Sequence, residues 1–156
     1  MRLRLDLQLA VDTARHEVPA KRAMAGWIKA ALAEQCERAE LTVRVVEASE
    51  IAELNQTYRH KAGPTNVLSF ESDLPSELRG AFLGDIVVCP EVLEREAVEQ
   101  GKSLEAHWAH MMVHGGLHLL GYDHIDEAEA QEMERMETAI MHTLKFSDPY
   151  QANSAT

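Results

Sequence analysis

Three histidines stand within eleven positions in the C-terminal third of the chain. The stretch HGGLHLLGYDH, residues 114–124, spaces His114, His118 and His124 as H-x-x-x-H-x-x-G-x-x-H. This is the zinc-ligand spacing of metzincin proteases, which carry a glutamate directly after the first histidine as their general base. Here that position is Gly115. The spacing predicts a metal site, and the glycine raises the question of which reaction such a site would serve.

The three imidazoles can reach one ion if the first two lie on a helix. His114 and His118 are then one turn apart on the same face. Gly121 can take a positive φ without steric cost, so the chain can turn back and bring His124 to the same ion. Three neutral imidazoles suit Zn²⁺ and leave one tetrahedral position open, as in catalytic sites. We expect one zinc ion per chain, although imidazole also suits iron and nickel.

Two neighbouring residues are candidates for supporting the site. His110 lies one turn before His114, and we expect it to support a ligand or to pack in the core. Asp123 could orient a ligand imidazole through its second ring nitrogen, or serve only as a turn residue. The alternative for the whole cluster is a packed, hydrogen-bonded core. The cost of burying three imidazoles in an apolar segment disfavours that alternative.

An anionic substrate would need a cation beside the metal. The stretch YRHK, residues 58–61, is a local basic patch, and Arg59 is its best candidate. A guanidinium binds phosphate through two parallel hydrogen bonds and stays charged. An ordinary solvated arginine near a helix end is the alternative.

Composition bounds the class of protein. The chain has 156 residues, 46% of them apolar, and a net charge of −11. We expect a single catalytic domain over residues 1–146 and a flexible polar tail over residues 147–156. The widely spaced Cys36 and Cys89 favour free thiols over a disulfide or a cysteine-rich zinc site. The acidic balance argues against indiscriminate binding of nucleic acid.

The N-terminal stretch alternates polar and apolar residues, unlike a signal peptide. No apolar run approaches the length that spans a bilayer. We therefore expect a cytoplasmic protein with no membrane partner.

Hydrophobic patterning predicts the elements that position these residues. Strands are expected at residues 2–10, 41–48, 66–71 and 83–89, and helices at 19–38, 49–58, 91–100, 103–120 and from 126 onward. The last two strands should be antiparallel neighbours, and Ser49, Ser103 and Asp126 are the expected helix N-caps. Residues 72–81 look like a polar loop, and the helix at 91–100 looks charged and exposed. Strands mostly precede helices, which indicates an α+β fold with a small mixed sheet of about four strands covered by helices.

The histidine motif resembles the H-G-x-L-H-L-x-G-Y-D-H signature of the YbeY family, single-strand-specific endoribonucleases of bacterial ribosomal RNA maturation. Three upstream motifs are similar in order and approximate spacing. NQTYR (55–59) resembles the family's N-x-x-Y-R, PTNVLSF (64–70) its P-T-[D/N]-V-L-S-F, and LGDI (83–86) its L-G-D-I. The matching motifs span under half of the chain and are specific.

This resemblance implies that His114, His118 and His124 bind zinc and that Arg59 is the catalytic arginine. It implies an α+β fold in which the histidine-bearing helix forms a metal site in a cleft. It also implies action on single-stranded ribosomal RNA, notably at small-subunit ends, and a part in ribosome quality control. The expected partners are the ribosome or its small subunit, with no DNA substrate. Attack by water and attack by the RNA's own 2′-hydroxyl both stay open, and the loop at 71–81 matches no motif.

Two other functions fit parts of the sequence. A zinc protease is supported by ligand spacing alone, because the glutamate is absent and nothing obvious replaces it. A ribosome-assembly factor with a structural zinc and incidental nuclease activity is the second alternative. The open coordination position and Arg59 favour the enzyme. A phosphodiester substrate would also make Gly115 tolerable, because its cleavage does not require the base that a protease uses.

Overall fold

The fold is built on a four-stranded mixed sheet. The computed structural model describes residues 1–123 and 125–150. The strands are β1 (Arg2–Ala10), β2 (Arg38–Val46), β3 (Val67–Glu71) and β4 (Phe82–Val88), and they lie in the order β1-β2-β4-β3. The first three in this order are parallel, whereas β3 runs antiparallel to β4. The predicted α+β class, the mixed sheet and the antiparallel last pair are confirmed.

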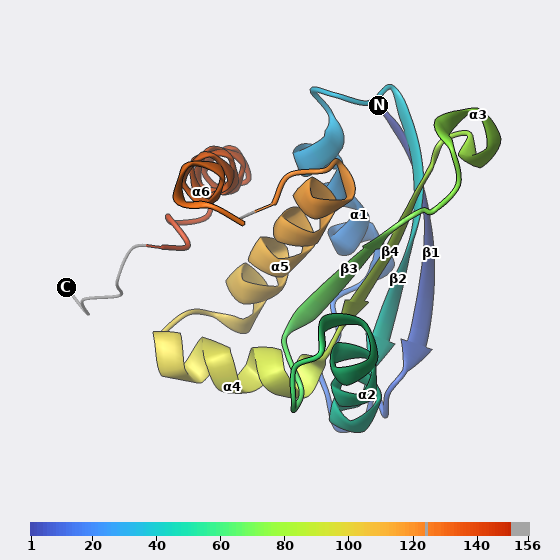
Figure 1. The fold of residues 1–156 in the computed structure, drawn as a ribbon. Coiled ribbons are helices and arrows are strands. Elements are labelled where there is room, and N and C mark those ends of the chain that lie inside the picture. Colours follow the sequence, from blue (N-terminus) through green and yellow to red (C-terminus); the bar gives the residue numbers. More distant parts are fainter. Residues whose placement is uncertain (124, 151–156) are drawn as a thin grey trace.

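Helices lie on both faces of this sheet. They are α1 (Lys21–Leu32), α2 (Ala48–Arg59), α3 (Ser76–Arg79), α4 (Pro90–Gln100), α5 (Leu104–Leu119) and α6 (Glu127–Thr143). Helix α5 lies along one face and contacts α1, α4 and α6 as well as β3 and β4 (Figure 1). On the opposite face, Ile51 of α2 packs in a smaller apolar cluster with Leu68 and Val87. In the described part of the chain, no helix is long and apolar enough to cross a lipid bilayer.

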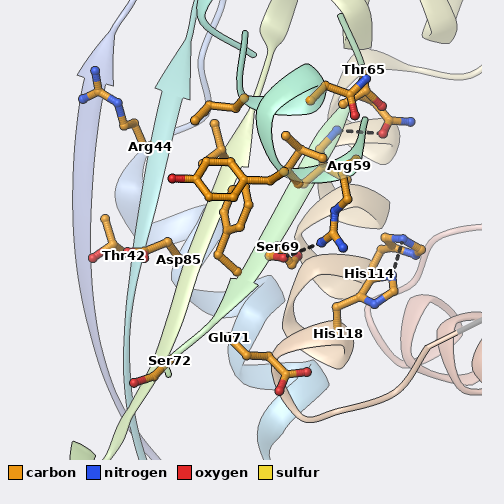
Figure 2. Close-up of a pocket in the computed structure, with 18 of the residues that line it drawn as sticks. Thr42, Arg44, Arg59, Thr65, Ser69, Glu71, Ser72, Asp85, His114 and His118 are labelled. Atoms are coloured by element: carbon orange, nitrogen blue, oxygen red, sulfur yellow. Dashed lines mark hydrogen bonds between the residues drawn. The ribbon is translucent and has the colours of Figure 1, made fainter. Parts of the chain in front are cut away.

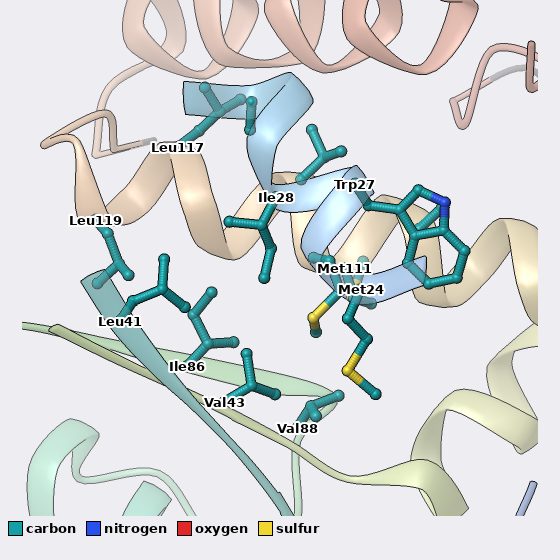
Figure 3. Packing of buried hydrophobic residues seen from close by; sticks show 14 of the residues in the cluster. Met24, Trp27, Ile28, Leu41, Val43, Ile86, Val88, Met111, Leu117 and Leu119 are labelled. Atoms are coloured by element: carbon teal, nitrogen blue, oxygen red, sulfur yellow. The ribbon is translucent and has the colours of Figure 1, made fainter. Parts of the chain in front are cut away.

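Two glycines let α5 approach its neighbours closely. The main core joins apolar side chains of α1, α5 and the central strands (Figure 3). A Cβ atom at Gly115 would lie 3.0 Å from Cδ1 of Ile86, and one at Gly116 would lie 3.2 Å from Cβ of Ala31. Both distances are tighter than ordinary van der Waals contact. The side of α5 at position 115 therefore faces β4 in the core, which answers why the position after the first histidine is not a glutamate.

The ends of the two helices that carry the site follow the local sequence. The Ser103 hydroxyl accepts a hydrogen bond from the Ala106 backbone N–H at the start of α5. The Asp126 carboxylate accepts one from the Glu129 N–H at the start of α6. Both N-caps are as predicted. Beyond α5, Gly121 has φ 100°, the positive value that the proposed turn requires.

Several local predictions were wrong, including the helix expected at 19–38, which ends at Leu32, while Arg38 begins β2. Helix α2 begins at Ala48, with Glu47 and not Ser49 as its N-cap. The Glu47 carboxylate accepts a hydrogen bond from the backbone N–H of Asp12, a contact between distant segments that local sequence does not encode. The polar loop contains the short helix α3. Helix α4 is half-buried, because its apolar side chains face the core: Val92, Leu93 and Ala97.

Candidate metal centre and cleft

Two imidazoles on α5 converge at their Nε2 atoms. His114 and His118 lie one turn apart, and their Nε2 atoms are 3.0 Å from each other. Two ligands of one tetrahedral zinc ion, each at about 2.05 Å, would lie about 3.3 Å apart. The pair therefore fits a shared ion with little movement. His124, the third predicted ligand, lies outside the described residues.

A buried carboxylate holds the first imidazole from behind. Glu137 of α6 is fully buried and accepts hydrogen bonds from His110 Nε2 at 2.7 Å and from His114 Nδ1 at 2.6 Å. The Tyr150 hydroxyl donates a third hydrogen bond to the same carboxylate. Burial by itself raises the pKa of Glu137, but the hydrogen bonds from the two imidazoles outweigh it and lower the pKa to about 2.

The charge of Glu137 decides which nitrogen of His114 carries a proton. An ionised carboxylate can only accept hydrogen bonds, so His114 must be protonated at Nδ1. In the neutral imidazole, Nε2 then keeps its lone pair and points toward His118. A carboxylate that orients a ligand histidine in this way is common in metal sites. The donor set around His114 therefore suits a metal ion on the Nε2 side.

The same carboxylate belongs to a second possible ligand set. Ligand atoms of His110, His114 and Glu137 lie within 4.8 Å of one another, so these three could hold a metal ion. His110 and Glu137 are buried and do not line the cleft, whereas His114 and His118 do. An ion held by the buried set would be shielded from a large substrate. An ion held by the two Nε2 atoms would face the cleft.

Glu137 was missed in the sequence, although a signal for it exists. Met133, Glu137 and Met141 follow one another at intervals of four residues along α6, and all three are buried. A carboxylate in a buried helical stripe is costly unless it has hydrogen-bonding partners. Such a residue in an acidic helix therefore points to a cluster of donors in the core.

Arg59 lines the same cleft as the two imidazoles but belongs to another helix. It is the last residue of α2, and its Nη2 donates a hydrogen bond to the Ser69 carbonyl oxygen at 2.9 Å. The Ser69 hydroxyl in turn donates to the Gly115 carbonyl at 3.4 Å, which links β3 to α5. Figure 2 shows the guanidinium between Ser69 and His114. The strand β3 thus aligns the end of α2 with the C-terminal part of α5.

These groups line one cleft of about 1410 Å³. Arg59, His114, His118 and Asp123 all contribute to its wall, whereas His110 lies behind it. Farther along the cleft lies Asp85 (Figure 2). Burial raises the pKa of the Asp85 carboxyl, and a side-chain hydrogen bond with Thr42 acts in the opposite direction. The cleft therefore combines a metal-binding face, one oriented guanidinium and a partly desolvated carboxyl group.

Comparisons with known proteins give one family and one fold. A family model described as endoribonuclease YbeY matches residues 8–145. Among solved structures, the solution structure of TM1509 from Thermotoga maritima is similar to this chain with a TM-score of 0.56 and 23% sequence identity. The match covers 96% of this chain and 99% of that one. At this level of identity, the likeness to the solved structure concerns the fold.

Proposed function

Because the chain belongs to the YbeY family of endoribonucleases, which act in ribosomal RNA processing, we propose that its cleft cleaves single-stranded ribosomal RNA. The proposal includes maturation of small-subunit RNA ends, a part in ribosome quality control, and the ribosome or its small subunit as partner. One observation carries it. Arg59 lines the same cleft as the convergent Nε2 atoms of His114 and His118.

The metal is assigned to the cleft face of α5. His114, His118 and His124 would hold one zinc ion per chain, with His124 assigned from its place in the motif. When bound, the ion supplies Lewis acidity toward an oxygen of the scissile phosphate. Glu137 keeps the proton of His114 on Nδ1, so that Nε2 is available as a ligand. The buried set of His110, His114 and Glu137 is less suited to this task, because a phosphodiester could not reach it.

Arg59 is assigned to the phosphate. One of its N–H groups is held by the Ser69 carbonyl, which orients the planar guanidinium in the cleft. Its remaining N–H groups can bind two phosphate oxygens at once. Negative charge builds up on these oxygens as the phosphodiester is attacked, so a guanidinium placed there lowers the barrier.

The test is cleavage of an end-labelled single-stranded RNA by metal-loaded protein. Arg59→Ala should keep its metal content and lose about 10²- to 10³-fold in the rate of cleavage. Arg59→Lys keeps the charge but not the planar group, so it should recover only part of the loss. His118→Ala should lose both metal and activity. Equal rates for all four proteins would mean that a contaminating nuclease does the cutting.

The ends of the products identify the attacking group. A 2′,3′-cyclic phosphate would show attack by the RNA's own 2′-hydroxyl, whereas its absence from the first products would favour water. A wild-type protein that cuts neither free RNA nor RNA in ribosomal particles would instead support an assembly factor with a structural metal.

A further inference from the structure

The charge of the cleft is a poor match for RNA. Among the described residues that line it, the cations are Arg44, Arg59 and Lys61, and the carboxylates are Glu50, Glu71, Asp73, Asp85 and Asp123. The carboxylates exceed the cations by two (5 − 3), so a bound divalent ion would only balance the excess. Attraction between phosphates and basic side chains is the usual source of affinity for single strands. In this cleft, that source is weak.

One of the three cations is already neutralised. The Arg44 guanidinium donates hydrogen bonds to both carboxylate oxygens of Glu50, at 2.7 and 3.0 Å. Within the described part of the chain, Arg59 and Lys61 are the lining cations that form no ion pair. Two phosphate contacts can position a strand without holding it tightly. The cleft therefore needs a second source of affinity that does not depend on charge.

An exposed aromatic side chain, Tyr58, directly precedes Arg59 in the sequence. Tyr58 lines the cleft and is 61% exposed, so much of its ring is open to a ligand. Phe70 of β3 packs against it with ring centroids 5.2 Å apart and planes at 67°. The Cζ atom of Arg59 lies 5.9 Å from the Phe70 ring centroid. Phe70 thus holds the tyrosine ring in place without covering it.

We propose that Tyr58 is a stacking platform for one unpaired nucleobase of the RNA, next to the phosphate bound by Arg59. This inference rests on the proposed function and adds to it a site for the base. Stacking suits an acidic cleft, because every base has an apolar π-face and the contact needs no positive charge. Bases inside a duplex have both faces covered by their neighbours. A platform at Tyr58 would therefore favour single strands over duplexes.

The first arm of the test measures binding of a short single-stranded RNA made uncleavable by 2′-O-methyl groups. Fluorescence anisotropy would compare metal-loaded wild type with Tyr58→Leu and Tyr58→Phe. Loss of one stacked base should weaken binding by roughly 5- to 100-fold in Tyr58→Leu. Tyr58→Phe should bind within about twofold of wild type, because the ring and not the hydroxyl makes the contact. Leu78→Ala serves as the control, since Leu78 is similarly exposed, at 72%, but lies outside the cleft.

The second arm identifies the base. A series of RNAs, each with one abasic nucleotide, should contain a single position at which wild type loses as much affinity as Tyr58→Leu does. Tyr58→Leu should bind that abasic RNA as tightly as it binds the intact RNA, because the stacking contact is already absent in this variant. The stacking proposal would be wrong, and the proposed function unaffected, if wild type and Tyr58→Leu bound RNA equally well. The same holds if the losses of affinity from the substitution and from the abasic nucleotide added together. No binding of any RNA by wild-type protein would overturn the proposed function as well.

Discussion

The His114 imidazole donates a hydrogen bond from Nδ1 to the buried Glu137 carboxylate over 2.6 Å. This contact joins α5 to α6 and leaves the lone pair of Nε2 available to a metal ion. Residues that orient a ligand in this way affect metal affinity nearly as strongly as ligands do.

Glu137→Gln should weaken zinc binding by about 10- to 100-fold. The amide keeps the shape of the carboxylate but presents an N–H₂ group to at least one imidazole N–H, so His114 loses its fixed tautomer. Competition with a chromophoric chelator measures the affinity. The circular dichroism of the metal-free variant controls for folding. An affinity equal to that of wild type in a folded variant would show that Glu137 has only a structural role.

Tyr150→Phe should have a smaller effect in the same direction. The Tyr150 hydroxyl donates to Glu137, and its ring packs edge-on against His110 at a centroid distance of 5.2 Å. The adjoining Pro149 carbonyl accepts a hydrogen bond from Lys102. We expect zinc affinity to fall about 3- to 10-fold. This is less than for Glu137→Gln, because Tyr150 contacts the carboxylate and not the imidazole itself. In the double variant with Glu137→Gln, the two losses should not add. Additive losses would separate Tyr150 from the carboxylate.

The stability of the metal-free protein should fall in mild acid because of His107. This buried side chain hydrogen-bonds Glu96 over 2.9 Å, and its Nδ1 has no partner among the described residues. Burial lowers the pKa of His107, and the hydrogen bond with Glu96 only partly opposes the effect. The unfolded chain therefore takes up a proton first as the pH falls. The resulting stability is present above the ordinary histidine pKa of about 6.5 and is lost below it.

Urea unfolding of wild type and His107→Gln between pH 5 and 8 checks this prediction. The difference between the two curves cancels the contributions of the other histidines. Wild type should lose stability relative to the variant as the pH falls below about 6.5. Parallel curves would exclude His107 as the source.

The affinity for single-stranded RNA should depend only weakly on salt. Each phosphate contact with a single strand contributes a slope of about −0.7 in log K against log salt concentration. With Arg59 and Lys61 as the available cations, the slope should be no steeper than about −1.4. Lys61→Ala should reduce it by about 0.7. A much steeper slope in an anisotropy titration would place the RNA on basic surface outside this cleft.

Gly84→Ala should severely destabilise the sheet. Gly84 has φ 145°, and a Cβ atom there would lie 2.1 Å from the Phe70 carbonyl oxygen. The loss should reach about 3 kcal/mol or more in free energy of unfolding, because backbone must move in both strands. Gly63 is the matched control, with a positive φ of 85° and nothing within 4 Å of its added Cβ. Gly63→Ala should lower the free energy of unfolding by only about 1 to 2 kcal/mol, the penalty for a Cβ atom at positive φ. Similar losses of stability in the two variants would show that the contact with the Phe70 carbonyl is not the cause of the destabilisation.

Local features of this protein could be predicted from the sequence. The helical spacing of His114 and His118, the caps at Ser103 and Asp126 and the turn at Gly121 depend on residues a few positions apart. Backbone geometry alone determines which of these residues face one another. The class of fold could also be predicted from the sequence, because the hydrophobic patterns of strands and helices differ in period.

Relationships between distant residues required the tertiary structure. The parallel pairing of β2 with β4 and the packing of α5 against the sheet bring Arg59 into the same cleft as His114. They also place Glu137 within hydrogen-bonding distance of that imidazole and turn Gly115 into the core. Such contacts depend on strand order and on helix packing, which no local spacing encodes. The histidine motif could therefore indicate a metal site, whereas the tautomer of His114, the orientation of Arg59 and the exposed ring of Tyr58 were decided by how the elements pack.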